Sequence, residues 1–207
     1  RPAAVAQEAG VKYFFLGAMS AAVMLFGFSY IYGMTGTTDL QQIQQRFVPD
    51  ENGVAAAVDP WLMFGVIVLL VGLAFKIAAF PMHFYAGDVY QGAATPVTAF
   101  LAFTPKAAGF VAIIKVLFVA GGGVWVASQT LVSLLSVLAV LTMFVGNVLG
   151  LLQYNVKRVL AYSSIAHSGY MLVGLTALIA AAWMPGVNDV RQVQIDALQG
   201  VLFYLAA

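Results

Sequence analysis

Long apolar runs separated by short polar connections extend over the whole 207-residue chain. Each run is close to the ~20 apolar residues that an α-helix needs to cross a bilayer. A transmembrane β-barrel would instead show alternating polar and apolar residues in shorter segments. The pattern therefore predicts an all-α, polytopic transmembrane helical bundle that forms a single membrane domain. We expect five complete transmembrane helices and the start of a sixth, at 11–32, 60–80, 96–118, 130–152, 159–183 and 197–207.

The segments between these runs are expected to be connections of different kinds. The first residues, RPAAVAQEAG, and the later MPGVNDVRQVQID are typical of loops, and VAGGGVWVASQ is typical of a tight glycine-rich turn. Asp39 is expected to cap a short interfacial helix that extends through Arg46. The sequence has no starting Met and ends inside an apolar run, so we expect a piece of a longer protein.

One apolar run, GLAFKIAAFPMHFYAGDVY, contains a lysine and then a proline. The segment from Pro60 to Asp88 is longer than a straight crossing needs, so we expect a helix that is broken between Lys76 and Pro81 and then resumes. Lys76 would then lie near the bilayer midplane beside unwound backbone, which is tolerated only where protein or a water-filled cavity surrounds it. If the helix instead ends at Lys76, its ammonium group can reach the interface. His83 is expected in a loop near the interface.

A second lysine, Lys106, lies ten residues into its predicted helix. At ~1.5 Å per residue this depth is ~15 Å, close to the bilayer centre. Pro105 directly precedes it and is expected to kink the helix and free a nearby carbonyl. Lys115, nine residues later, lies near the helix end, where its side chain can extend to the interface.

The helix expected at 159–183 carries a polar stripe inside an apolar segment. Ser163, His167 and Tyr170 follow i, i+4, i+7 spacing and so share one face, with Ser164 and Ser168 beside it. His167 is either a packing histidine or a proton-carrying side chain, and depth alone favours neither.

Ionisable side chains inside a membrane are rare. A lysine at the bilayer centre costs at least ~2.5 kcal/mol on insertion scales, so two lysines and a histidine in one small bundle indicate a hydrated interior path. Lysine also suits proton relay, because a desolvated ammonium group releases its proton readily whereas a guanidinium group stays charged.

Composition narrows the function classes. The chain is 62% hydrophobic and 8% charged, and its net charge of +1 indicates no nucleic-acid partner. The lack of cysteine excludes disulfides, thiolate metal sites and cysteine-ligated iron–sulfur clusters within this chain. Lys12, Lys157 and Arg158 lie on one predicted side of the membrane, opposite acidic loops, so the N-terminal side is expected to be cytoplasmic.

Three blocks resemble, in the same order, the antiporter-like subunit N family of respiratory complex I, the proton-translocating NADH:quinone oxidoreductase. They are VKYFFLGAMSAAVMLFGFSYIYGMTGTTDL, FKIAAFPMHFYAGDVYQGAATPVTAFLAFTPKAAGF and NVKRVLAYSSIAHSGYMLVG. The resemblance covers nearly the whole chain. DVYQGAATPVTAFLA followed by PK is more similar to subunit N than to its sister subunits L and M or to multisubunit Na⁺/H⁺ antiporters.

The resemblance implies that the chain matches the sixth family helix through the start of the eleventh. Lys76 then matches the lysine of the broken seventh helix, Lys106 the lysine of the eighth, and His167 a polar position of the tenth. A glutamate of the fifth helix and a lysine of the twelfth would lie before Arg1 and after Ala207.

The function that the resemblance implies is proton translocation by a membrane subunit of complex I, with Lys76, Lys106 and His167 as the catalytic proton relay. No cofactor is expected in this chain, because NADH, FMN, iron–sulfur clusters and quinone would bind partner subunits. The expected partners are the lipid bilayer and other membrane subunits, including neighbouring antiporter-like ones, in a bacterial inner membrane. The alternatives are a subunit of a multisubunit cation/proton antiporter and a passive structural subunit whose lysines only bind lipid headgroups or neighbouring helices.

Overall fold

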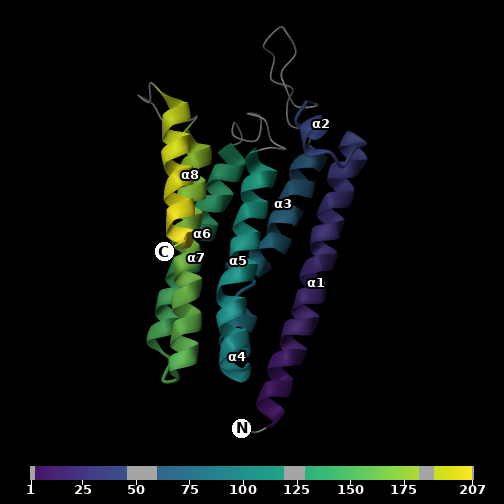
Figure 1. Cartoon of the computed structure of the whole chain (residues 1–207). Helices are drawn as coiled ribbons and strands as arrows, with labels where there is room; N and C mark the ends of the chain where they lie inside the picture. Colours follow the sequence, from purple (N-terminus) through teal and green to yellow (C-terminus); the bar gives the residue numbers. More distant parts are fainter. Residues whose placement is uncertain (1–2, 46–59, 119–128, 182–188, 207) are drawn as a thin grey trace.

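Eight α-helices and no strand make up the described part of the chain in this computed structural model, which covers residues 3–45, 60–118, 129–181 and 189–206 (Figure 1). The all-α fold predicted from the sequence is therefore confirmed. The helices are α1 (Ala3–Thr35), α2 (Leu40–Gln45), α3 (Pro60–Lys76), α4 (Phe84–Gly92), α5 (Thr95–Phe118), α6 (Gln129–Leu151), α7 (Val156–Ala180) and α8 (Val190–Ala206).

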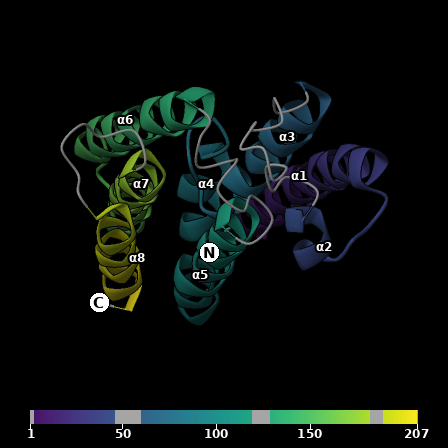
Figure 2. The same ribbon diagram turned by 90° about the horizontal axis from the view of Figure 1, so that it is seen from above.

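The long helices run roughly along one bundle axis and alternate in direction (Figure 1). The N-terminus and the turn between α6 and α7 lie at one end of the bundle, and α2 lies at the other. Seen along the axis, α1 and α3 form one flank, α6, α7 and α8 form the other, and α4 and α5 lie between them (Figure 2). The most extensive helix contacts join α6 to α7 and α1 to α3.

Among the described residues, four helices are long and apolar enough to cross a membrane: α1, α5, α6 and α7. Helix α3 is apolar but has only 17 residues. At ~1.5 Å per residue it spans ~25 Å, which is less than the ~30 Å hydrocarbon core of a bilayer. A crossing by this segment therefore needs both α3 and the shorter α4 that follows it.

Two helices begin well before their predicted first residues. Helix α1 begins at Ala3 rather than Val11, because the expected loop AAVAQEAG consists mostly of good helix formers. Helix α8 begins at Val190 rather than 197, and the Asp189 carboxylate caps it by accepting a hydrogen bond from the Gln192 N–H at 3.0 Å. Asp39 caps α2 in the same way, as expected. The predicted end of that helix at Arg46 lies outside the described residues. The predicted glycine-rich turn at 119–129 lies outside them except for its last residue.

Glycines permit the close contact between α1 and α3. A Cβ atom on Gly27 would lie 2.7 Å from the Leu69 backbone nitrogen and 2.8 Å from the Gly65 carbonyl oxygen. A Cβ atom on Gly65 would lie 2.8 Å from the Tyr30 Cβ. Small residues at both sides of the contact therefore let the two backbones touch, as they do between transmembrane helices in general.

Candidate functional site

The crossing made by α3 and α4 is broken in its middle. Helix α3 ends at Lys76, α4 begins at Phe84, and the two lie one after the other along the bundle (Figure 1). Between them Ala78 adopts a left-handed φ of 53°, which is uncommon for a residue with a side chain. The broken helix predicted around Lys76–Pro81 is therefore present.

Side chains from α1, α4 and α6 form hydrogen bonds with backbone groups at this break and in the last turn of α3 before it. Unwound backbone inside a membrane is stable only where protein or water supplies such partners. The hydrogen bonds run from the Ser20 hydroxyl to the Gly72 carbonyl (2.8 Å), from the Tyr85 hydroxyl to the Phe75 carbonyl (2.9 Å), and from the Phe80 N–H to the Thr142 hydroxyl oxygen (3.0 Å).

Thr142→Val is expected to destabilise the protein by about 1–3 kcal/mol, the usual penalty for a buried N–H that loses its acceptor. Thr142 is fully buried, and valine keeps nearly the same shape but cannot accept the hydrogen bond from Phe80. Thr176→Val on α7 is the matched control, because the Thr176 hydroxyl donates its hydrogen bond to the Leu172 carbonyl of the same helix. Thermal denaturation of the two purified full-length variants measures the difference. Equal denaturation temperatures would contradict this role of Thr142.

Lys76 lies at the end of the first half-helix, and its side chain is exposed. The expectation that it is buried is wrong for the described residues, although its neighbours Phe75 and Ile77 are both buried. Within the described residues no hydrogen bond or ion pair reaches its ammonium group. Its position at the C-terminus of α3 places a positive charge where the helix dipole is negative.

The break touches α5 close to the second lysine. A Cβ atom on Gly109 would lie 3.1 Å from the Lys76 Cβ and 2.7 Å from the Ile77 Cγ2, so α5 passes the end of α3 in direct contact. Gly109 lies three residues after Lys106 on α5, which is about one helical turn. The two lysines therefore belong to adjacent parts of the same helix crossing.

Lys106 is the one buried lysine among the described residues, with 5% of its surface exposed. Its ammonium group donates a hydrogen bond of 2.6 Å to the Ser164 carbonyl oxygen and another to the Ser164 hydroxyl oxygen. No carboxylate pairs with it among the described residues. Pro105 lies inside α5 directly before it, as the sequence indicates. Among the described residues, the oxygen atoms that hold this buried ammonium group are therefore both neutral.

A pocket of about 460 Å³ lies between α5, α7 and α8 and contains the Lys106 side chain. Its polar lining includes Ser163, Ser164, His167 and Tyr204. The sequence therefore predicted correctly that one face of α7 is polar. Lys76 does not line this pocket.

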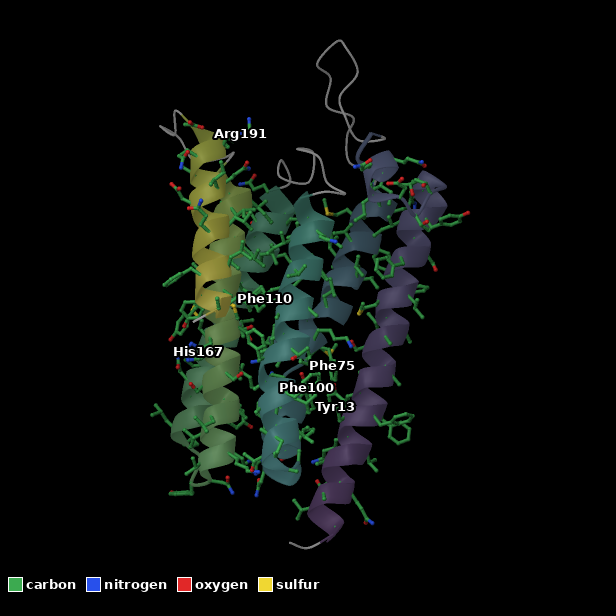
Figure 3. All side chains as sticks on the ribbon, viewed as in Figure 1. Tyr13, Phe75, Phe100, Phe110, His167 and Arg191 are labelled. Carbon is green, nitrogen blue, oxygen red and sulfur yellow. The ribbon has the colours of Figure 1, made fainter. Side chains whose placement is uncertain are left out.

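His167 is exposed to the pocket rather than buried. Its Nδ1 atom lies 2.5 Å from the hydroxyl oxygen of Tyr204 on α8. Tyr170, the third residue of the predicted stripe, packs its ring edge-on against the His167 ring but does not line the pocket. Figure 3 shows His167 and Phe75, the neighbour of Lys76, at a similar level along the bundle.

His83 lies in the connection before α4, as expected, but it is buried rather than exposed near the interface. Only 4% of its surface is exposed, and its ring packs between those of Phe80 and Phe84. Its Nδ1 atom is buried without a hydrogen-bond partner among the described residues. The aromatic residues on either side of it in the sequence could have predicted this burial, because they give the imidazole an apolar packing site.

An ion-pair cluster fixes α4 between α1 and α7 at the N-terminal end of the bundle. Asp88 accepts from Lys12 at 2.5 Å and from Arg158 at 2.7 Å. Lys157 donates to the Ala93 carbonyl at the end of α4 at 3.1 Å. The sequence predicts Lys157 and Arg158 only as charges that set the membrane orientation. Both basic residues also hold the second half-helix in place.

The described residues offer no site for a metal ion, since no three His, Asp or Glu side chains gather in them. Of the three site residues predicted from the sequence, Lys106 and His167 line the pocket, and Lys76 lies at the break. Lys115, on the same helix as Lys106, is exposed near the end of α5 as expected.

Comparison with known proteins agrees with this arrangement. The chain is 45% identical to NADH-quinone oxidoreductase subunit N of Myxococcus xanthus over 212 residues, which cover 97% of this chain and 40% of the relative. It aligns with a chain of respiratory complex I from Thermus thermophilus with bound aureothin at 36% identity and a TM-score of 0.65, covering 96% of this chain and 38% of that one. It also shares the fold of a chain in the Mrp complex from Dietzia sp. DQ12-45-1b, at 21% identity and a TM-score of 0.74, covering 98% of this chain and 34% of that one.

The chain spans about two fifths of the length of the curated relatives it matches. The family profile described as "NADH:quinone oxidoreductase/Mrp antiporter, TM" matches residues 2–186. This match shows that the chain, with its broken helix and its lysine-containing pocket, belongs to the NADH:quinone oxidoreductase/Mrp antiporter transmembrane family.

Proposed function

We propose that this chain is the central part of subunit N of a proton-translocating NADH:quinone oxidoreductase, and that Lys106, His167 and Lys76 carry protons through it. The observation that carries the proposal is the buried Lys106, whose ammonium group is held, within the described residues, only by the neutral oxygen atoms of Ser164. A buried charge without a counter-ion is costly in a membrane and is a functional-site hypothesis by default.

The pocket provides a route for the proton that Lys106 releases. At ~30 Å³ per molecule, its volume of about 460 Å³ has room for on the order of ten waters. Its polar lining from α7 can hold such waters in a chain between Lys106 and His167. A proton leaving the ammonium group of Lys106 then reaches the His167 ring through hydrogen-bonded water. Lys106 takes up a new proton from the side of the pocket that faces Lys76.

Lys76 is the proposed switching site. Its exposed ammonium group ends the first half-helix, next to the contact between α3 and α5. We infer that a carboxylate from another helix of the full-length subunit, which the family resemblance implies, pairs with it in one state. At 4 Å and an effective dielectric constant of 20, two unit charges interact by about 4 kcal/mol. Making and breaking such a pair is therefore strong enough to change which side chain holds the proton.

The electron transfer that drives this movement takes place elsewhere. NADH, FMN, iron–sulfur clusters and quinone bind partner subunits in this proposal, and other membrane subunits transmit the electrostatic change. The membrane is a bacterial inner membrane with the N-terminal end of the bundle in the cytoplasm. The cluster of Lys12, Lys157 and Arg158 at that end supports this orientation, since cytoplasmic ends of transmembrane helices carry an excess of basic residues.

The proposal is tested with the full-length subunit carrying Lys76→Ala and Lys106→Ala together, in inside-out membrane vesicles. NADH-driven proton uptake, followed by quenching of a pH-sensitive dye, is expected to fall to the leak level while the complex stays assembled on native gels. Normal uptake would contradict the proposal and favour a passive structural subunit. A Na⁺ gradient that drives proton exchange without NADH, and only with the lysines intact, would favour the cation/proton antiporter instead.

A further inference from the structure

A tyrosine from a third helix contributes a polar group to the pocket. Tyr204 lies near the end of α8, and its hydroxyl oxygen is 2.5 Å from the Nδ1 atom of His167 on α7. Both residues line the pocket that contains Lys106. This hydrogen bond brings a proton-exchanging group on α8 into contact with the face that bears Ser163 and Ser164.

The hydroxyl of Tyr204 is singled out by the packing around His167. Two tyrosine rings contact the imidazole, with centroids 5.7 Å away for Tyr204 and 5.9 Å away for Tyr170. Only the Tyr204 hydroxyl bonds to a ring nitrogen, and no hydrogen bond involves the Tyr170 hydroxyl in the described part of the chain. The two tyrosines thus make similar ring contacts but differ in whether their hydroxyl groups reach the imidazole.

This geometry suits proton transfer across the imidazole ring. A neutral histidine has one N–H and one free nitrogen, and its Nδ1–H can donate to a phenolic oxygen. When a proton from the pocket reaches the free Nε2 atom of His167, an Nε2–H bond forms, the Nδ1–H bond breaks, and its proton passes to the Tyr204 oxygen. The original O–H bond of Tyr204 then breaks and releases its proton on the α8 side of the pocket. One proton has entered and one has left, and the ring has changed tautomer, which rotation or the reverse exchange restores.

We propose that Tyr204 is a proton-transferring residue, which passes protons between His167 and the α8 side of the pocket. This inference rests on the proposed function, because it extends the route from Lys106 and His167 by one residue. It also specifies a direction: the route leaves the pocket on the flank of the bundle opposite α1 and α3 (Figure 2).

The test compares Tyr204→Phe with Tyr170→Phe in the full-length subunit within the assembled complex. The first variant keeps the aromatic ring but removes the hydroxyl that reaches His167, and the second removes a hydroxyl that does not. We expect Tyr204→Phe to slow NADH-driven proton pumping about tenfold. This is less than the ~10²–10⁴-fold that a direct acid–base group contributes, because water can replace a hydroxyl. Tyr170→Phe is expected to pump at the normal rate.

A second readout separates proton transfer from packing. Tyr204→Phe is expected to change the ratio of pumping rates in H₂O and D₂O and the pH at which pumping is half-maximal. A purely structural tyrosine would lower the amount of complex without changing either quantity. Normal pumping in Tyr204→Phe, equal losses in both tyrosine variants, or a loss with an unchanged isotope ratio and pH profile would each overturn the inference. Lys106→Ala is measured beside them: if it loses pumping while Tyr204→Phe does not, only this inference fails, and if it pumps normally, the proposed function fails.

Discussion

Lys106→Ala is expected to abolish NADH-driven proton pumping while leaving the subunit in its complex. Lys106 is the buried ammonium group of the pocket, and removing a direct proton-transfer group slows transfer by ~10²–10⁴-fold. Assembly should survive, because the substitution removes a charge that costs at least ~2.5 kcal/mol at the bilayer centre. The Ser164 carbonyl also keeps a hydrogen-bond donor, since the Ser168 hydroxyl donates to it at 3.1 Å.

The matched control for this variant lies on the same helix. Lys115 is exposed near the end of α5, so Lys115→Ala removes an equal charge outside the pocket and is expected to pump normally. Lys106→Arg keeps the positive charge but cannot release a proton, so it is expected to be as inactive as Lys106→Ala. All three variants are compared by their initial rates of dye quenching, which report proton pumping, and of NADH:quinone reduction. Pumping that survives in Lys106→Arg would show that the charge, rather than proton release, is required.

Lys76→Ala is expected to lose both pumping and the quinone reduction coupled to it. Lys76 ends the first half-helix at the break, and α5 touches its backbone region at Gly109. Without its ammonium group, a charge change arriving from partner subunits has no site through which to act on Lys106. The measurement is NADH:quinone activity together with proton uptake, in vesicles whose content of assembled complex has been determined.

Lys76→Arg distinguishes a switching lysine from a structural one. An arginine at this position would still place a positive charge at the C-terminus of α3, which stabilises the helix dipole by typically 0.3–1 kcal/mol. It would hold its proton at every pH of interest. We expect Lys76→Arg to assemble normally and remain uncoupled. Restored pumping in Lys76→Arg would mean that Lys76 acts only through its charge.

The sequence predicted the features that depend on local composition and length. The runs of apolar residues predicted the helices, because a bilayer requires ~20 such residues per crossing. The break after Lys76 was predicted from Pro81 and from a segment too long for one straight crossing. The i, i+4 spacing of Ser163 and His167 placed them on one polar face of α7, and both line the pocket.

The sequence could not predict features that depend on how distant segments meet. Lys76 and Lys106 lie in similar apolar surroundings in the sequence, yet one is exposed and the other buried. The difference follows from the geometry of the break and from the approach of α7, whose Ser164 accepts from Lys106. Tyr204 was overlooked for the same reason, since its contact with His167 joins residues 37 positions apart.

The most direct test of the account is the number of protons translocated per NADH oxidised, measured for Lys106→Ala beside Lys115→Ala in vesicles with equal amounts of assembled complex. We expect a normal ratio for Lys115→Ala. For Lys106→Ala we expect either no measurable turnover or a reduced ratio in whatever turnover remains. A normal ratio at a normal rate in Lys106→Ala would contradict the proposed function, because protons would then cross this subunit without the one lysine that lines the described pocket.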